Sequence, residues 1–406
     1  MGDHRKPEPD VGEAKPPPGN PELRHRLDRA LEAERGWPAD SPWVRRAVED
    51  LPRHLFAPDR VWVWDGSTYV PVDRTADPGR WAELVYPQPD EATVTQVTDG
   101  LATSSLSCQA VVVDMLDSLM PEPGHRVLEL GTGAGWNAAL LAARAGPGRV
   151  TSVEVDPGLA EAARARLGAA GAEVNVVTGD GAHGWAESAP FDRLIATYAV
   201  DEVPWAWVEQ TRPGGRIVTP WGRLGHVALT VADDGRSASG WMQGLATFMP
   251  SRGTGQGLPW DRIRGTVPAG TAGPFQQPLR RLHDEVSLLF ALRVVLPDVR
   301  ITTRAYDDGV SAWLHDGRAS WATLDARAGD PAVACQGGPR RLADETSRTM
   351  EKWLTAGEPS LYDFGMTRTP DQQFIWTGDK DTGPRWTAAS GQCEAEWGGS
   401  VAGIAG

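Results

Sequence analysis

Residues 125–145, HRVLELGTGAGWNAALLAARA, decide the fold of this chain. An apolar stretch ends in a turn with glycine at positions 131, 133 and 135, and an alanine- and leucine-rich stretch follows at once. Glycine is needed where the backbone turns sharply and lies close against a ligand. The pattern therefore predicts a strand, a glycine-rich turn and a helix that begins beside a bound ligand.

The segments that follow alternate in the same way. Strands are expected at 149–155, 173–179, 191–197, 214–220 and 226–233, and helices at 158–171 and, ahead of the turn, at 109–119. Strands that alternate with helices predict a doubly wound, mostly parallel α/β sheet. Such sheets bind ligands at the carboxyl ends of their strands, so we expect the functional site there.

Acidic residues stand at three of these strand ends. Glu129 comes two residues before the first glycine, Glu154 ends the second strand and Asp180 ends the third. An acid about 20 residues beyond such a turn accepts hydrogen bonds from ribose hydroxyls, with Asp156 as the competing candidate. An acid ahead of the turn suits a cationic sulfonium better than a diphosphate. We therefore predict S-adenosyl-L-methionine as cofactor, S-adenosyl-L-homocysteine as product, and the cofactor-binding residues Glu129, Gly131, Thr132, Gly133, Gly135, Glu154, Asp180, Gly181 and Thr197.

Composition narrows the function classes further. The chain has 406 residues, a net charge of −14 and three scattered cysteines, Cys108, Cys335 and Cys393. An acidic chain is a poor nucleic-acid binder, and the cysteine spacing indicates neither a zinc cluster nor a disulfide framework. No apolar run is long enough for a membrane span, and the N-terminus lacks a signal region. We expect a cytoplasmic protein without metal, nucleic-acid or membrane partners.

The chain divides by composition into four predicted parts. Residues 1–20 are rich in proline and charge and are predicted to be disordered. Residues 21–104 combine helical spacing with strand alternation on the substrate side, and residues 105–238 carry the cofactor motifs. Residues 239–406 break the alternation and hold no chemical motif. We predict that they form an additional α+β domain that recognises a peptide.

Several segments resemble the protein-L-isoaspartate O-methyltransferase family. They are SLSCQ (105–109), VLELGTGAGWNAALLA (127–142), GDGAHGWAESAPFDRLIAT (179–197), EQTRPGGRIVTPWG (209–222) and, ahead of them, PRHLFAP (52–58). The resemblance implies a Rossmann-like class I methyltransferase that esterifies an aspartyl or isoaspartyl carboxylate in a peptide. It also implies that Ser105 and Ser107 border the substrate carboxylate. The alternative for both serines is capping of the helix at 109–119.

The chain departs from this family at the substrate side and in its length. Residues 108–110 (Cys-Gln-Ala) stand where proline is usual, and residues 197–200 (Thr-Tyr-Ala-Val) replace a short alanine run. The extra C-terminal residues, notably 337–342, 350–354 and 375–378, resemble extended homologues associated with ribosomal graspetides, lasso peptides and lanthipeptides. That resemblance implies an L-aspartate of a modified or cyclised precursor peptide as acceptor. Its ester would close to aspartimide, which persists or hydrolyses to isoaspartate.

Three other functions compete with this one. The first is repair of isoaspartyl residues in damaged proteins, and the second is a peptide-binding scaffold with a vestigial methyltransferase part. The third is an RNA methyltransferase, which the negative charge disfavours. A carboxylate is already ionised at neutral pH, so no general base is required and catalysis should come from positioning.

Overall fold

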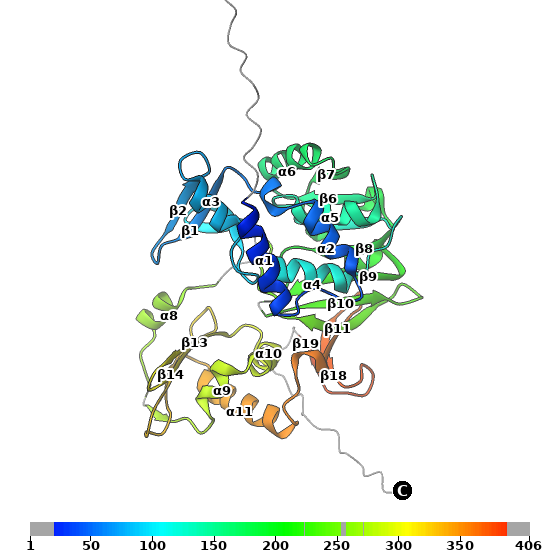
Figure 1. Cartoon of the computed structure of the whole chain (residues 1–406). Helices are drawn as coiled ribbons and strands as arrows, with labels where there is room; N and C mark the ends of the chain where they lie inside the picture. The colour runs from blue at the N-terminus through cyan, green and yellow to red at the C-terminus, as the bar shows by residue number, and fades with distance from the viewer. Residues whose placement is uncertain (1–19, 223, 253–256, 271, 388–406) are drawn as a thin grey trace, which may run out of the picture.

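The computed structural model describes residues 20–222, 224–252, 257–270 and 272–387 of the chain. The predicted disordered tail lies outside the described residues, except for Asn20. Within the described ranges the strands form three sheets of four, ten and five strands (Figure 1). The ten-stranded sheet is the centre of the molecule, and its strand order is β19-β18-β17-β11-β10-β9-β8-β5-β6-β7.

One half of the central sheet is parallel. Its strands are β7 (Val174–Thr178), β6 (Val150–Glu154), β5 (Val127–Leu130), β8 (Phe191–Ala196) and β9 (Thr211–Trp221). Helices α5 (Trp136–Ala145), α6 (Pro157–Ala169) and α7 (Trp205–Glu209) connect them. This half confirms the predicted doubly wound sheet. The strand order reverses between β5 and β8, which is the switch point where such sheets bind ligands.

The other half of the central sheet is antiparallel and reaches into the C-terminal part. Strands β10 (Gly225–Val231) and β11 (Ala238–Gly244) follow β9, and β11 then pairs with β17 (Phe364–Arg368). Strands β18 (Gln373–Thr377) and β19 (Arg385–Thr387) complete the edge. The predicted boundary between residues 238 and 239 falls inside β11, because the tail adds its last strands to the sheet that carries the cofactor motifs.

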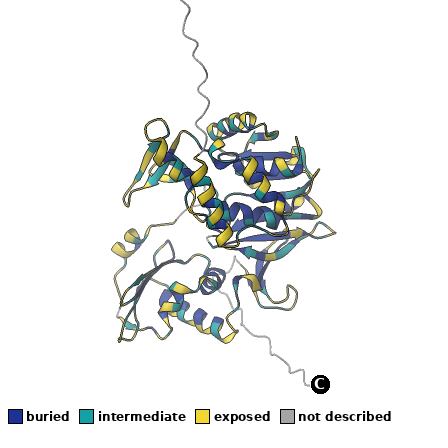
Figure 2. Cartoon of the chain, viewed as in Figure 1, coloured by how far each residue is buried: buried dark blue, intermediate teal, exposed yellow. Residues whose placement is uncertain are grey.

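Different segments pack against the two faces of the central sheet. Alternate strand residues, such as Val127, Val150 and Ile195, face a cluster with the helices α1 (Pro21–Ala33), α2 (Pro42–Asp50), α4 (Gln109–Leu119) and α5. Their neighbours Leu128 and Leu194 face the opposite way. This alternation follows from the period of two along a strand. Figure 2 shows the sheet strands mostly buried and the outer helix surfaces exposed.

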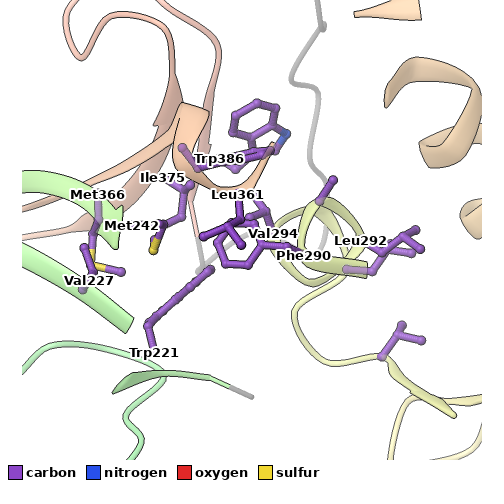
Figure 3. Packing of buried hydrophobic residues seen from close by; sticks show 14 of the residues in the cluster. Trp221, Val227, Met242, Phe290, Leu292, Val294, Leu361, Met366, Ile375 and Trp386 are labelled. Carbon is purple, nitrogen blue, oxygen red and sulfur yellow. The ribbon is translucent and has the colours of Figure 1, made fainter. Parts of the chain in front are cut away.

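The second face is covered by α7 and by the C-terminal part. Helices α9 (Leu279–Asp284), α10 (Val286–Val295) and α11 (Leu342–Thr355) share one apolar cluster with the central sheet. Figure 3 shows Phe290 of α10 among Trp221 of β9 and Met242 of β11. The same cluster includes Leu314 and Leu324 of the five-stranded sheet, which is formed by β12 (Gly273–Pro274), β16 (Val333–Gly337), β15 (Trp321–Arg327), β14 (Gly309–His315) and β13 (Arg300–Tyr306). The tail is thus α+β, and it shares its core with the central sheet.

The third sheet lies on the N-terminal side of the molecule (Figure 1). Its order is β2-β1-β3-β4, with bounds Tyr69–Asp73, Arg60–Trp64, Thr93–Thr98 and Leu101–Leu106. The helix α3 (Pro78–Val85) packs against β1 and β2, and the short helix α8 (Trp260–Thr266) packs against β15. Strand β4 leads directly into α4 through residues 107 and 108, which brings the predicted substrate segment up to the central sheet.

Candidate functional site

A cavity of about 810 Å³ lies at the carboxyl ends of the parallel strands, at the switch point between β5 and β8. Four groups of residues, from different parts of the sequence, contribute most of its lining. The first is the glycine turn with the ends of β6, β7 and β8, the second is residues 102–108, the third is residues 247–252, and the fourth is residues 200–204. The lining therefore includes Ser105, Ser107, Gly131, Thr132, Gly133, Gly135, Glu154, Asp180, Gly181 and Thr197.

The glycine turn needs its glycines for two reasons. Gly131, Gly133 and Gly135 have φ values of +93°, +51° and +92°, in the region that side chains disfavour. A Cβ atom on Gly131 would also lie 2.5 Å from Oγ1 of Thr197. Gly135 is the N-cap of α5, so the free N–H groups of this helix begin at the cavity. The turn thus presents backbone donors to the cavity.

Glu154 is the acid best placed for ribose hydroxyls. It lines the cavity and is only 5 % exposed. Its Oε2 accepts a hydrogen bond from the N–H of Gly133 at 2.9 Å, and its Oε1 accepts one from the N–H of Asp156 at 3.1 Å. Each oxygen keeps capacity for a further donor. Asp156, the competing candidate, instead caps α6 through the N–H groups of Gly158 and Leu159.

Glu129 lies one layer below the cavity and is not among the residues that line it. Its side chain is fully buried and accepts hydrogen bonds from Asn137 Nδ2, at 2.8 Å, and from Ser152. Ser152 is also 2.6 Å from Oγ1 of Thr132, in the turn. Burial raises the pKa of Glu129 to about 7. In this arrangement Glu129 supports the glycine turn from behind.

The ends of β7 and β8 form the adjoining wall. The Asp180 side chain is 62 % exposed and accepts from the N–H of Ala182 at 2.9 Å. The hydroxyl of Thr197 donates to the carbonyls of Leu130 and Gly131, which ties β8 to the turn. Tyr198 also lines the cavity, and sequence reasoning noted it only as a departure from a family pattern. A Cβ on Gly181 would lie 2.5 Å from its hydroxyl oxygen, so no larger residue fits there.

Ser105 and Ser107 also line the cavity, and a Cβ atom on Gly133 would lie 3.8 Å from the carbonyl oxygen of Ser105. Neither caps α4, whose N-cap is Cys108 and which has no side-chain cap hydrogen bond. The segment is held by Arg53, whose Nη1 donates to the carbonyl of Ser107 at 2.6 Å and whose Nε donates to the carbonyl of Val85 at 3.0 Å. Arg53 is buried, and burial lowers its pKa to about 10. The PRHLFAP segment thus contributes a buried clamp on the backbone of the serine segment.

Residues 247–252, which sequence reasoning missed, form the third wall. They follow β11, and the N–H of Ala199 donates to the carbonyl of Met249 at 2.8 Å. Arg252 lies 3.3 Å from a carboxylate oxygen of Asp156 and donates to Oε1 of Gln96 at 3.1 Å. This segment therefore links the sheet to the β3–β4 hairpin beside the cavity. A loop without a motif gave no signal for these contacts.

Other polar groups lie outside the cavity. His226, Ser118 and Asp114 form a cluster, but both neighbours approach the same nitrogen, Nε2, at 3.3 and 3.7 Å. A nucleophile relay needs both ring nitrogens, so this cluster is not one. Among the described residues there is no group of three or more His, Cys, Asp or Glu side chains suited to a metal ion. In the same ranges, no helix has the length and apolar character to cross a membrane.

Comparisons with known proteins find similar sequences and a similar fold. A family model described as protein-L-isoaspartate(D-aspartate) O-methyltransferase matches residues 77–248. The protein-L-isoaspartate O-methyltransferase 2 of Archaeoglobus fulgidus is 32 % identical over 235 residues, which is 57 % of this chain and 94 % of that protein. The enzyme so named in Hyperthermus butylicus is 34 % identical, over 52 % of this chain and 80 % of the relative.

Higher identity occurs over shorter stretches. The protein-L-isoaspartate O-methyltransferase of Anaeromyxobacter dehalogenans is 50 % identical over 120 residues, which is 29 % of this chain and 56 % of that protein. The chain thus spans little more than half the length of this relative. A solved structure titled protein-L-isoaspartate O-methyltransferase, 20 % identical, has a TM-score of 0.50 and covers 88 % of this chain and all of that one. That share is too large to end at residue 248, so the likeness in fold continues into the C-terminal part.

Proposed function

Because the chain belongs to the protein-L-isoaspartate O-methyltransferase family, we propose that it transfers a methyl group from S-adenosyl-L-methionine to an aspartyl-derived carboxylate in a peptide. One observation carries this proposal. One cavity is lined both by the glycine turn with the buried Glu154 and by Ser105 and Ser107. A cofactor and a carboxylate can therefore meet inside one enclosure.

The residues present fit the cofactor. The Glu154 carboxylate is fixed by two backbone N–H groups and can accept from both ribose hydroxyls. The start of α5 offers N–H groups and a partial positive charge to the cofactor's carboxylate. Asp180, largely exposed in the cavity, can accept from the adenine amino group. When bound, the cofactor supplies a methyl group on a sulfonium, with a thioether as leaving group.

The protein's own contribution is positioning. An aspartyl or isoaspartyl carboxylate is ionised at neutral pH and is already nucleophilic. The Ser105 and Ser107 hydroxyls can each donate to it, and the Arg53 clamp fixes the backbone that carries Ser107. No histidine is among the cavity-lining side chains of the described residues. Holding the carboxylate oxygen in line with the methyl carbon thus supplies the rate enhancement.

The finer proposal concerns the acceptor. We propose an L-aspartate in a modified or cyclised ribosomal peptide. After esterification, the amide nitrogen of the next residue attacks the ester carbonyl, and methanol leaves with the amide proton. The product is aspartimide, which water can open to isoaspartate. Support comes from the C-terminal resemblance and from the contribution that residues beyond 238 make to the cavity.

The alternative is repair of L-isoaspartyl residues in damaged proteins. The names of the relatives favour it, and the solved structure with a similar fold over most of the chain carries the same name. A C-terminal part is thus compatible with either acceptor, and the acceptor itself must be tested.

The deciding experiment offers two peptides to the full-length protein. One is an L-isoaspartyl hexapeptide, and the other is a macrocyclic peptide with an ordinary L-aspartyl-glycine step. Mass spectrometry follows the gain of one methyl group and then the loss of methanol. Tailoring predicts at least about tenfold higher kcat/KM for the cyclic peptide. A preference for the hexapeptide would replace tailoring with repair, and cofactor binding without turnover of either would refute methyl transfer to peptides.

A further inference from the structure

Residues 200–204, which we call the 200–204 wall, connect β8 to α7 and contribute Val200, Asp201, Glu202 and Pro204 to the cavity lining. Some of the hydrogen bonds that hold these residues come from β9. The N–H of Val200 donates to the carbonyl of Pro220, and Trp221 Nε1 donates to the carbonyl of Asp201 at 2.9 Å. Further hydrogen bonds to this wall come from side chains more than 90 positions further along the chain.

Three side chains of the C-terminal part form hydrogen bonds and ion pairs with the 200–204 wall. Arg293 of α10 donates from Nη2 to Oδ1 of Asp201 at 2.7 Å. Gln373 of β18 donates to the carbonyl of Asp201 at 3.0 Å and accepts from the N–H of Val203 at 2.8 Å. Arg368 of β17 donates to the carbonyl of Val203 at 2.7 Å and pairs with Glu202 at 2.9 Å. Together they fix both the backbone and the acidic side chains of the wall.

Burial of the charged guanidinium groups of Arg293 and Arg368 costs free energy of folding. The Arg293 and Arg368 side chains are 6 % and 7 % exposed, whereas the carboxylates that they pair with are 80 % and 60 % exposed. Among the described residues, Nε and Nη1 of Arg293 have no hydrogen-bond partner, although the guanidinium lies 4.7 Å from the ring centre of Trp221. Apolar residues at such positions often give equal or greater stability. Stability alone therefore does not account for two buried arginines here.

We infer that Arg293, Arg368 and Gln373 are positioning residues for the acceptor peptide. They act through the 200–204 wall, of which Asp201 and Glu202 line the cavity, and within the described ranges none of their hydrogen bonds goes to the cofactor-side residues Glu154 and Asp180. The C-terminal part is then a constituent of the acceptor site. This inference rests on the proposed function for its kinetic test, and it has a second, kinetics-independent test.

The kinetic test uses Arg293→Met and Gln373→Leu, with Arg281→Met as the matched control. Arg281 also belongs to the C-terminal part, pairs with two glutamates and lies over Trp353, but it does not reach the cavity. The acceptor is whichever of the two test peptides the wild type methylates. We expect KM for the peptide to rise about tenfold or more in both variants, with KM for S-adenosyl-L-methionine within about twofold. The control should change neither.

A further pair of variants separates positioning from general support. If Arg293 acts through Asp201, Asp201→Asn should add little to the peptide KM of Arg293→Met. Arg293→Lys, which keeps the charge, should recover part of the lost affinity. Equal rises in KM for both substrates, or full additivity of the two changes, would overturn the inference.

The second test measures hydrogen exchange of the 200–204 wall in full-length protein without any peptide. The N–H of Val203 is bonded to Gln373, so its exchange should rise at least about tenfold in Gln373→Leu and stay unchanged in Arg281→Met. Unchanged exchange in Gln373→Leu would refute the inference. This readout tests the hold of Gln373 on the wall even if the wild type methylates neither peptide, which would refute only the proposed function.

Discussion

The two ends of the cavity are built in different ways. The proposed cofactor end consists of backbone N–H groups and acids at strand ends, and its central turn lies within residues 129–135. The proposed acceptor end joins residues 102–108, the 200–204 wall and residues 247–252; distant arginine side chains bind the backbone of the first two, and backbone bonds to Ala199 hold the third. A short local pattern thus determines the first end, and contacts between distant segments determine the second. The variants below test whether the two ends are separable.

The largest effect is expected in the apolar cluster that the central sheet shares with the C-terminal part. Phe290 of α10 is fully buried and lies edge-on to both Trp221 and Phe364. Phe290→Ala should cost about 3–5 kcal/mol of unfolding free energy because it leaves a cavity. Since one cluster spans both parts, the whole chain should lose stability together. Denaturant unfolding followed with and without S-adenosyl-L-homocysteine checks this; two transitions with only one shifted would mean separable parts.

A pH series addresses the cofactor end. The pKa of Glu129 is raised to about 7, so the folded protein holds a proton that the unfolded chain releases above about pH 4.5. The stability from this proton is full below about pH 4.5 and is lost as the pH rises through 7. Glu129→Gln imitates the protonated form and should gain up to about 3 kcal/mol over wild type between about pH 5 and pH 8.

The measurement is the unfolding free energy at several pH values. Glu161→Gln serves as the control, because Glu161 is a largely exposed glutamate on α6 that pairs with Arg164. Parallel pH curves for wild type and Glu129→Gln would show that the buried carboxyl is not the titrating group.

Gly131→Ala should impair the cofactor end of the cavity and weaken binding there. It would place a methyl group 2.5 Å from Oγ1 of Thr197 on a backbone with φ of +93°. We expect affinity for S-adenosyl-L-homocysteine to fall by about 100-fold in calorimetry, equal to about 2.7 kcal/mol. Gly146→Ala is the matched control: its φ is +103° but nothing lies within 4 Å of the new methyl. Equal losses in both would assign the effect to backbone strain alone.

Ser107→Ala tests the acceptor end and should have the smallest effect. Loss of one hydroxyl that orients a carboxylate should lower kcat/KM for the peptide by about tenfold, with cofactor affinity unchanged. His183→Ala is the comparison, because its side chain is 85 % exposed and does not line the cavity; it should stay within about twofold. A larger loss for His183→Ala than for Ser107→Ala would reverse the assignment.

The same contrast explains what the sequence could predict. The strand, turn and helix at 125–145 follow from local periodicity, and the bounds of α4 agree with the expected 109–119, because their signals lie within a dozen residues. The hydrogen bond from Ser152 to Glu129 could not be predicted, because it depends on the register of β5 against β6. Likewise nothing local to Arg53, Arg293 or Gln373 says which distant backbone they bind.

The pairing of β11 with β17 has a consequence for the order in which the chain assembles. During synthesis, β11 leaves the ribosome long before Phe364–Arg368, so its free edge must wait for a distant segment. An unpaired edge strand is a template for association with other chains. A chain cut after residue 248 would retain every cofactor motif yet expose that edge permanently. We expect such a fragment to precipitate, and the sheet to close only after Phe364–Arg368 have been synthesised.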